Sequence, residues 1–461
     1  MRITKSQIRA RVRSEIPITF SEERISAHGG LELVRRFLET LDFRRRLAEA
    51  TRGVGREGDY GFVRILMALM GMVIVGGARV THLAFIGVDP VFLRFCGLHR
   101  VPSDRTVVTW LKAFTPPALE ALSDLIRDLV YEQIERLRLR RLTIDVDGSV
   151  LRTGSKVGGT ARGFNPHHPK DPSYYPLSAH LAQLGQILRV QNRPGNVHDS
   201  HNAAGFLRVV VRELRERFGR IPLELRMDGA FFHPEIFRFL DGEVGRGIEY
   251  AIKVPMWKWL GLLPIIASRR RWTRVDAYVD GFETHLKIDQ WERTERIVVY
   301  RKRVSHKSRK NFQLDLFSPD DGHYEYSAVA TNKALQIAPL WHFMAGRGGH
   351  EKTYAELKQH FAFEAIPTND MMANSAWQLI TMLALNLMRS FQIALGASPR
   401  GRTWKRTFDY VFQSMQTVRF ELIHQPLRLV RPAGRTELRF AVSPVARRRI
   451  QRAERQLKRA A

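Results

Sequence analysis

The hydrophobic pattern of the chain changes at Arg141, and this change restricts the fold more than any other feature of the sequence. From Gly30 to Arg140, apolar residues recur every three or four positions, as on one face of a helix. Residues 142–146 instead alternate between apolar and polar side chains, which predicts a strand. We therefore expect a helical N-terminal domain followed by a region that forms a sheet.

Several short elements follow this first strand. Runs at 175–182 and 186–191 flank turn residues around Gly185 and predict a hairpin. The elements expected next are a helix at 200–218, a strand at 223–227, a helix through Phe237 and Leu240, and a strand at 250–254. In this β-β-β-α-β-α-β order, the first and fourth strands can be neighbours, and the class is α/β.

The rest of the chain divides into regions that differ in hydrophobic pattern and charge. Short β-like runs replace the helical period after Trp257 and predict a β-rich insertion, and a long apolar helix is expected from Ala373 to about Leu395. From Arg431 the chain has ten Lys or Arg and two Glu, which we interpret as a solvated basic tail or helix. The predicted parts are 1–140, a helical region; 141–256, the first part of an α/β core; 257–334, the insertion; 335–400, the second part of the core; and 401–461, a basic region.

Charge points to a polyanionic partner. The 461 residues include 74 Lys or Arg against 46 Asp or Glu, a formal net charge of +28. Nucleic acid is the first candidate, because it relieves such self-repulsion. An anionic membrane is not favoured: the longest apolar run, Ile65 to Ala78, is shorter than the ~20 residues of a span, and we expect a buried core helix there. With no signal-peptide pattern, we expect a cytoplasmic protein.

The helical region contains one local signal with two interpretations. Ser103 or Asp104 is placed to cap a short helix that includes Val107 and Trp110. This helix would suit a helix-turn-helix reader of DNA, and it would equally suit an ordinary helical bundle. The single cysteine, Cys96, excludes an internal disulfide and a cysteine-based zinc cluster.

Two aspartates follow predicted strands. Asp147 ends the first strand and Asp228 follows the fourth, so neighbouring strands would bring the two carboxylates together. Carboxylates this close repel unless a cation neutralises them, and hard oxygen ligands suit magnesium or manganese. The alternative is two unrelated aspartates, each solvated or capping a turn, and spacing alone does not separate these interpretations.

A third carboxylate strengthens the metal hypothesis. Arg347, Glu351 and Lys358 are spaced by four and seven residues, which places them on one face of a helix. Arg347 lies among glycines, where the backbone can approach a phosphate closely, and a guanidinium suits bidentate phosphate contact. Without the two aspartates, a plain charged helix face would explain this pattern.

Together these residues resemble the catalytic signature of bacterial insertion-sequence DDE transposases. The groups that carry the resemblance are Asp147-Gly148-Ser149, Arg226-Met227-Asp228-Gly229 with Phe231, and Arg347, Glu351 and Lys358. Arg193-Pro194-Gly195-Asn196-Val197-His198, Asn374 and Asn386-Leu387 also look like this family. The likeness covers about 140–395.

The closest resemblance is to the cut-and-paste branch with a β-rich insertion before the glutamate. That branch has a signature of Tyr, two residues, Arg, three residues, Glu, six residues and Lys. This chain keeps Arg347, Glu351 and Lys358 at that spacing and has Met344 at the tyrosine position. By this resemblance, Met344 would lack one hydroxyl contact to a terminal phosphate, and the three carboxylates would be unaffected.

The resemblance implies a ribonuclease H-like catalytic core with two Mg²⁺ or Mn²⁺ ions held by Asp147, Asp228 and Glu351. Asp145 competes with Asp147 for the first position, although Gly148-Ser149 after Asp147 fits the family pattern better. It further implies a DNA transposase that binds the terminal inverted repeats of its element through residues 1–140, cleaves them, and joins the 3′ ends to target DNA. Dimerisation on the DNA ends and association with a bacterial nucleoid are expected.

Other residues are candidates for DNA contact. The predicted phosphate binders are Arg347, Lys358, Arg193, Arg447, Arg448 and Arg449. Trp257, Trp259 and Trp272 could stack on a base flipped out of a distorted DNA end, and core packing is the alternative for them. A nuclease that cleaves without joining, or a catalytically silent DNA-binding derivative, remains the competing function.

Overall fold

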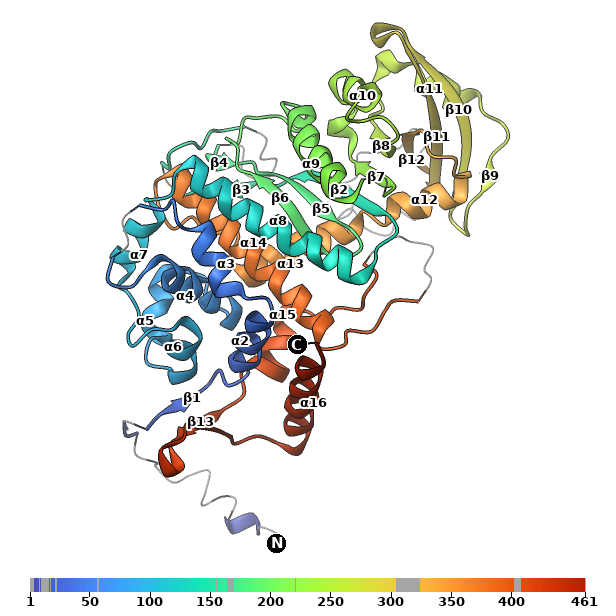
Figure 1. Cartoon of the computed structure of the whole chain (residues 1–461). Helices are drawn as coiled ribbons and strands as arrows, with labels where there is room; N and C mark the ends of the chain where they lie inside the picture. Colours follow the sequence, from blue (N-terminus) through green and yellow to red (C-terminus); the bar gives the residue numbers. More distant parts are fainter. Residues whose placement is uncertain are drawn as a thin grey trace.

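The computed structural model describes residues 23–460 except 56–57, 155, 164–169, 220, 304–323 and 402–407, together with 4–7, 9, 16 and 18–20. A group of helices forms one end of the molecule, and a long mixed sheet extends from it to the opposite end (Figure 1). The predicted mixed α/β class is confirmed.

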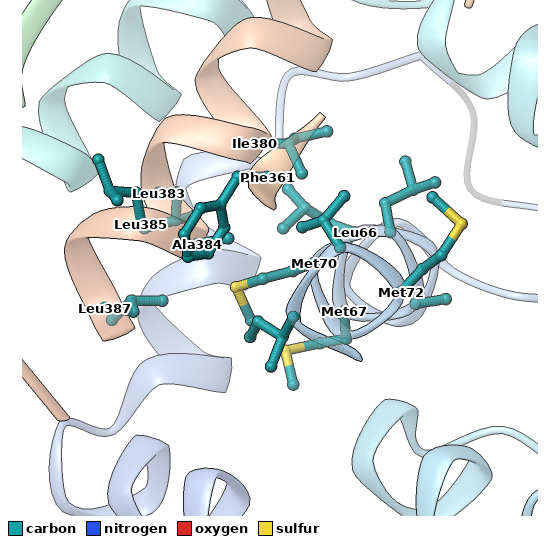
Figure 2. Packing of buried hydrophobic residues seen from close by; sticks show 14 of the residues in the cluster. Leu66, Met67, Met70, Met72, Phe361, Ile380, Leu383, Ala384, Leu385 and Leu387 are labelled. Atoms are coloured by element: carbon teal, nitrogen blue, oxygen red, sulfur yellow. The ribbon is translucent and has the colours of Figure 1, made fainter. Parts of the chain in front are cut away.

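The helical N-terminal region forms around one buried helix. Its helices are α2 (Leu31–Thr40), α3 (Phe43–Ala50), α4 (Phe62–Val75), α5 (Leu83–Ile86), α6 (Pro90–Cys96), α7 (Asp104–Leu111) and α8 (Pro116–Leu137). Nearly every residue of α4 is buried, as predicted for a core helix, and Met67, Met70 and Leu66 lie close to Phe361 and α14 (Met371–Ala394) (Figure 2). Ser103, one of the two predicted caps, accepts a hydrogen bond from the Thr106 amide.

No single helix in the described part of the chain is both long and apolar enough to cross a membrane. Within the described part of the chain, α4 and the segment Val80–Ile86 reach the length and apolar composition of a membrane span only when taken together. The two segments are bent by 87° relative to each other.

The predicted strands form the centre of the sheet. They are β2 (Leu142–Gly148), β5 (Leu177–Leu181), β6 (Gln186–Gln191), β7 (Leu223–Met227) and β8 (Glu249–Val254). Their spatial order is β6-β5-β2-β7-β8, with β2 parallel to β7 and antiparallel to β5. The first and fourth strands are therefore neighbours, as predicted. The helices α9 (Ala203–Phe218) and α10 (Pro234–Asp241) connect β6 to β7 and β7 to β8.

The insertion extends this sheet. Its elements are α11 (Leu262–Ser268), β9 (Thr273–Arg274), β10 (Val279–Ile288), β11 (Arg293–Arg303) and β12 (Tyr324–Thr331). β12 pairs antiparallel with β8, so the full order is β6-β5-β2-β7-β8-β12-β11-β10-β9. The insertion thus covers the edge of β8, which would otherwise expose unpaired backbone groups.

The chain then returns to the helical end. The remaining main elements are β3 (Leu151–Arg152), β4 (Ser173–Tyr174), α12 (Ile337–Ala345), α13 (Gly348–Phe361), α15 (Met415–Val418), β13 (Leu427–Val430), β14 (Glu437–Phe440) and α16 (Pro444–Ala460). β13 pairs with both β14 and β1 (Ile25–Ser26). The basic C-terminal part is thus a folded hairpin and helix that pack on the N-terminal region (Figure 1).

Candidate active site

Asp147 and Asp228 leave the sheet at the same edge. In the parallel pair of β2 and β7, Val146 lies opposite Met227, and each aspartate is the next residue along its strand. Asp147 accepts a hydrogen bond from the Gly148 amide (3.0 Å), and Asp228 accepts one from the Ala230 amide (3.0 Å). The sheet register therefore brings together the two carboxylates that the sequence placed at strand ends.

The guanidinium of Arg347 lies between these carboxylates and the third one. Its Nη2 is 2.6 Å from Asp147 Oδ2 and 4.0 Å from Asp228 Oδ2, and its Nη1 is 3.9 Å from Glu351 Oε1. Arg347 directly precedes α13, so Glu351 follows it by one helical turn. The Arg347 side chain is only 13% exposed, whereas that of Glu351 is 70% exposed. All three predicted acidic residues thus surround one buried cation.

This crowding changes the ionisation of the site. Burial raises the pKa of Asp147 to about 7 against the opposing effect of Arg347, and the carboxylates of Asp228 and Asp199 add to the rise. Burial alone would lower the pKa of Arg347, but the surrounding carboxylates outweigh it and raise that pKa. Negative charge is therefore in excess here.

The donor set fits divalent cations. Three carboxylates offer hard oxygen ligands, the type that Mg²⁺ and Mn²⁺ prefer. Nε and Nη2 of Arg347 are buried and make no well-aligned hydrogen bond within the described part of the chain, so the 2.6 Å contact of Nη2 with Asp147 is an ion pair. Asp147, Asp228 and Glu351 can therefore hold metal, with Arg347 beside it.

Asp145, the alternative to Asp147, lies inside the sheet. Its fully buried carboxylate accepts hydrogen bonds from Arg226 Nε (2.6 Å) and Nη2 (2.8 Å), and His180 Nδ1 is 3.4 Å away. Burial opposes ionisation, yet Arg226 and His180 outweigh it and lower the pKa of Asp145 to about 2. Asp145 is therefore the counter-ion of a buried arginine, Arg226.

The structure separates the predicted phosphate binders. Lys358 Nζ donates to the Val150 carbonyl (3.2 Å), which places the ammonium beside the end of β2. Arg193 differs from the expectation, because it is buried and its guanidinium donates to the carbonyls of Tyr175, His198 and His201. These bonds make Arg193 a support of its own loop and leave no exposed face for a phosphate.

The three basic residues at 447–449 lie on the exposed part of α16. Arg449 forms an ion pair with Glu421.

The predicted tryptophans also fall into two groups. Trp257 and Trp259 are 40% and 46% exposed and stack on each other with ring centroids 5.4 Å apart. Trp257 lines a cavity of about 240 Å³ together with Lys253 and with Gly229 and Ala230, which follow Asp228. Trp272 instead packs against Phe282 at 4.7 Å and lies under the Arg301 guanidinium, as expected for a core residue.

Two neighbours of the site escaped the sequence analysis. Asp199 is 6% exposed, accepts a hydrogen bond from the Tyr175 hydroxyl (2.8 Å), and lies against Gly148. His350 Nδ1 is 3.5 Å from Asp147 Oδ2, and burial lowers its pKa well below the usual value. A signal for Asp199 existed: β6 is parallel to β2, so the loop after β6 starts at the same sheet edge as Asp147.

Comparison of the chain with protein families and with solved structures identifies the class of protein to which it belongs. The chain matches the family model for the transposase DDE domain, group 1, over residues 8–461, and it belongs to that family. The family implies a nuclease or transposase enzyme. No curated protein matches the chain. A solved structure described as a piggyBac transposase synaptic complex with hairpin DNA is similar to 85% of this chain and 80% of its own, with 10% identity and a TM-score of 0.44.

Proposed function

We propose that this protein is a transposase that binds the ends of a mobile element, cleaves the DNA with divalent metal ions, and joins the 3′ ends to target DNA. The arrangement of Asp147, Asp228 and Glu351 around Arg347 carries this proposal. The strand order β6-β5-β2-β7-β8, with the acids at the ends of adjacent parallel strands, supports a ribonuclease H-like core.

The spacing of Arg347, Glu351 and Lys358 supports the insertion-sequence branch within this family. Met344 stands where that branch has tyrosine, so the phosphate near this position would lose one hydroxyl partner. Residues 1–140 are the proposed DNA-end-binding region.

The proposed role of each residue at the site follows from its position. Asp147, Asp228 and Glu351 would hold two Mg²⁺ or Mn²⁺ ions, which when bound activate the attacking oxygen and stabilise the leaving one. Arg347 contacts Asp147 and Lys358 contacts the Val150 carbonyl, both near the end of β2, where they would hold the phosphate of the reacting strand and neutralise its charge. The exposed rings of Trp257 and Trp259 would stack on a base displaced from the DNA end.

A metal-dependent nuclease that cleaves without joining would use the same carboxylates. Inverted repeats flanking the coding region would favour the transposase. The test uses a labelled duplex that ends in such a repeat, a supercoiled target plasmid, purified protein and Mn²⁺. We expect cleaved ends and covalent joint products. Cleavage without joint products would establish the nuclease, and the absence of both with a folded protein would reject the proposed chemistry.

A further inference from the structure

The C-terminal helix α16 has two opposite faces. Ile450, Ala453 and Leu457 recur at helical spacing and are buried, and α16 packs on α2. An ion pair of 2.9 Å between Arg36 of α2 and Glu454 of α16 adds a polar contact at this junction. The orientation of α16 on the molecule is therefore set by packing.

Four arginines form the opposite face. Arg448, Arg452, Arg455 and Arg459 follow one another at intervals of four, three and four residues, so they lie within about 60° of one another around the helix. All four side chains are exposed, and none of them forms an ion pair within the described part of the chain. Arg449 and Lys458, on the flanks, pair with Glu421 and Glu454. We call these four residues the arginine face.

We propose that the arginine face binds the phosphate backbone of duplex DNA, independently of base sequence. Guanidinium groups suit phosphate oxygens, and four of them over about 17 Å of helix offer a row of contacts. A basic helix that binds membranes inserts its apolar face into lipid, but the apolar face of α16 is already covered by the protein. The inference rests on the proposed function in taking DNA as the substrate.

This surface lies away from the reacting strand. α16 packs against α14, and Gln456 lies near Gly396, just after the C-terminal end of α14. Near the other end of α14, Asn374 donates to the Tyr174 hydroxyl (3.2 Å), and the adjacent Tyr175 binds Asp199 beside Gly148. From Asn374 to Ala394, where α14 ends, the helix is about 30 Å long. The arginine face would therefore hold flanking or target DNA.

The test measures binding of a fluorescent 30-base-pair duplex of arbitrary sequence by the full-length protein across a range of salt concentrations. In a plot of log K against log salt concentration, the slope is negative. Replacing all four arginines of the face by glutamine should make this slope less steep by about 3 to 4, since each phosphate contact contributes about −0.9. The exposed positions should tolerate glutamine, and circular dichroism checks the fold.

A matched pair of double variants separates position from net charge. R448Q/R452Q removes two charges at i and i+4 of α16, and R208Q/R212Q removes two exposed charges at the same spacing on α9. We expect only the α16 pair to reduce the slope, by about 2. Equal effects of the two pairs, or no effect of the fourfold variant, would overturn the inference.

The outcome is separable from that of the proposed function. A wild-type slope near zero would reject DNA as the partner altogether. A steep slope that the fourfold variant leaves unchanged would reject the arginine face alone. Binding to phosphatidylserine vesicles that depends on the four arginines, with unchanged duplex binding, would assign the surface to a membrane and also reject the inference.

Discussion

Among the residues that the structure describes, two groups of three carboxylates are paired with arginines in different ways. Glu120 and Asp124 of α8 and Glu213 of α9 have ligand atoms within 4.8 Å of one another. Arg127 contacts Asp124 at 2.6 Å and Glu213 at 3.0 Å. Arg189 contacts Glu120 at 2.6 Å and Glu213 at 3.1 Å. Two arginines thus pair directly with the three acids.

The group formed by Asp147, Asp228 and Glu351 has one arginine among three acids, and only one of its contacts is short. Its two aspartates are also more buried than Glu120 and Asp124, with side-chain exposures of 19% and 24% against 52% and 43%. If the distance between the carboxylates were the only criterion for a metal site, the group of Glu120, Asp124 and Glu213 would be chosen. Excess negative charge beside two partly buried aspartates is the reason that we propose the second group as the site for a cation, although Glu351 is itself 70% exposed.

The largest effect that tests this comparison is on strand cleavage. Asp147→Asn, Asp228→Asn and Glu351→Gln each remove a ligand charge at constant size, and each should lower the cleavage rate by about a thousandfold or more, because metal ions stabilise the transition state by several kcal/mol. Folding and duplex binding should persist. Glu120→Gln and Glu213→Gln serve as controls and should cleave at the wild-type rate. A loss in these controls would reverse the assignment of the two groups.

The next effect is on stability and separates Asp145 from Asp147. Asp145→Asn leaves the Arg226 guanidinium buried without its counter-ion, which should cost about 3–5 kcal/mol of unfolding free energy. Asp147→Asn should leave stability within about 1 kcal/mol while abolishing cleavage. Urea denaturation of both variants provides the measurement. A stable Asp145→Asn protein without activity would instead make Asp145 a metal ligand.

The sequence could predict the site where backbone geometry alone determines it. The order of the strands places Asp147 beside Asp228, and a one-turn spacing places Arg347 beside Glu351. The strand pattern alone did not separate Asp145 from Asp147, because residues two apart in a strand share a face, and only the Gly148-Ser149 pair after Asp147 favoured that residue. The choice depends on Arg226, which lies opposite Asp145 in the register of β2 and β7.

Contacts between residues far apart in the sequence account for the other differences between the sequence predictions and the structure. The sequence predicted Arg193 as a phosphate contact, but in the structure its guanidinium donates hydrogen bonds to three backbone carbonyl groups. Composition does not show that these carbonyl groups lie around Arg193. Most of the β-like runs of the insertion lie in strands, but residues 275–278, part of one such run, connect β9 to β10. The periodicity of the runs carried no information on which sheet they would join. The pairing of β12 with β8 is a property of the folded chain.

A smaller effect concerns the two cations beside the site. Arg347→Ala and Lys358→Ala should each reduce cleavage and joining by about a hundredfold, as expected for the loss of one preorganised group that stabilises charge. Manganese affinity, measured by calorimetry on the same proteins, should be unchanged or higher, because Arg347 contacts the carboxylates from within the cluster. Arg127→Ala in the other group is the control. Loss of manganese binding would show that Arg347 supports the ligands instead of the DNA.

The smallest effect is a dependence of stability on pH in the absence of metal. Because the pKa of Asp147 is raised from 3.8 to about 7, the folded protein retains a proton that the unfolded chain releases above about pH 4. Asp147 therefore contributes stability at low pH, and this contribution is lost as the pH rises towards 7. Between pH 5 and 7 in EDTA, the wild type should lose about 2 kcal/mol relative to Asp147→Asn. Parallel profiles for the two proteins would show that Asp147 is already ionised at pH 5, and they would contradict the difference in charge balance that we infer between the two groups.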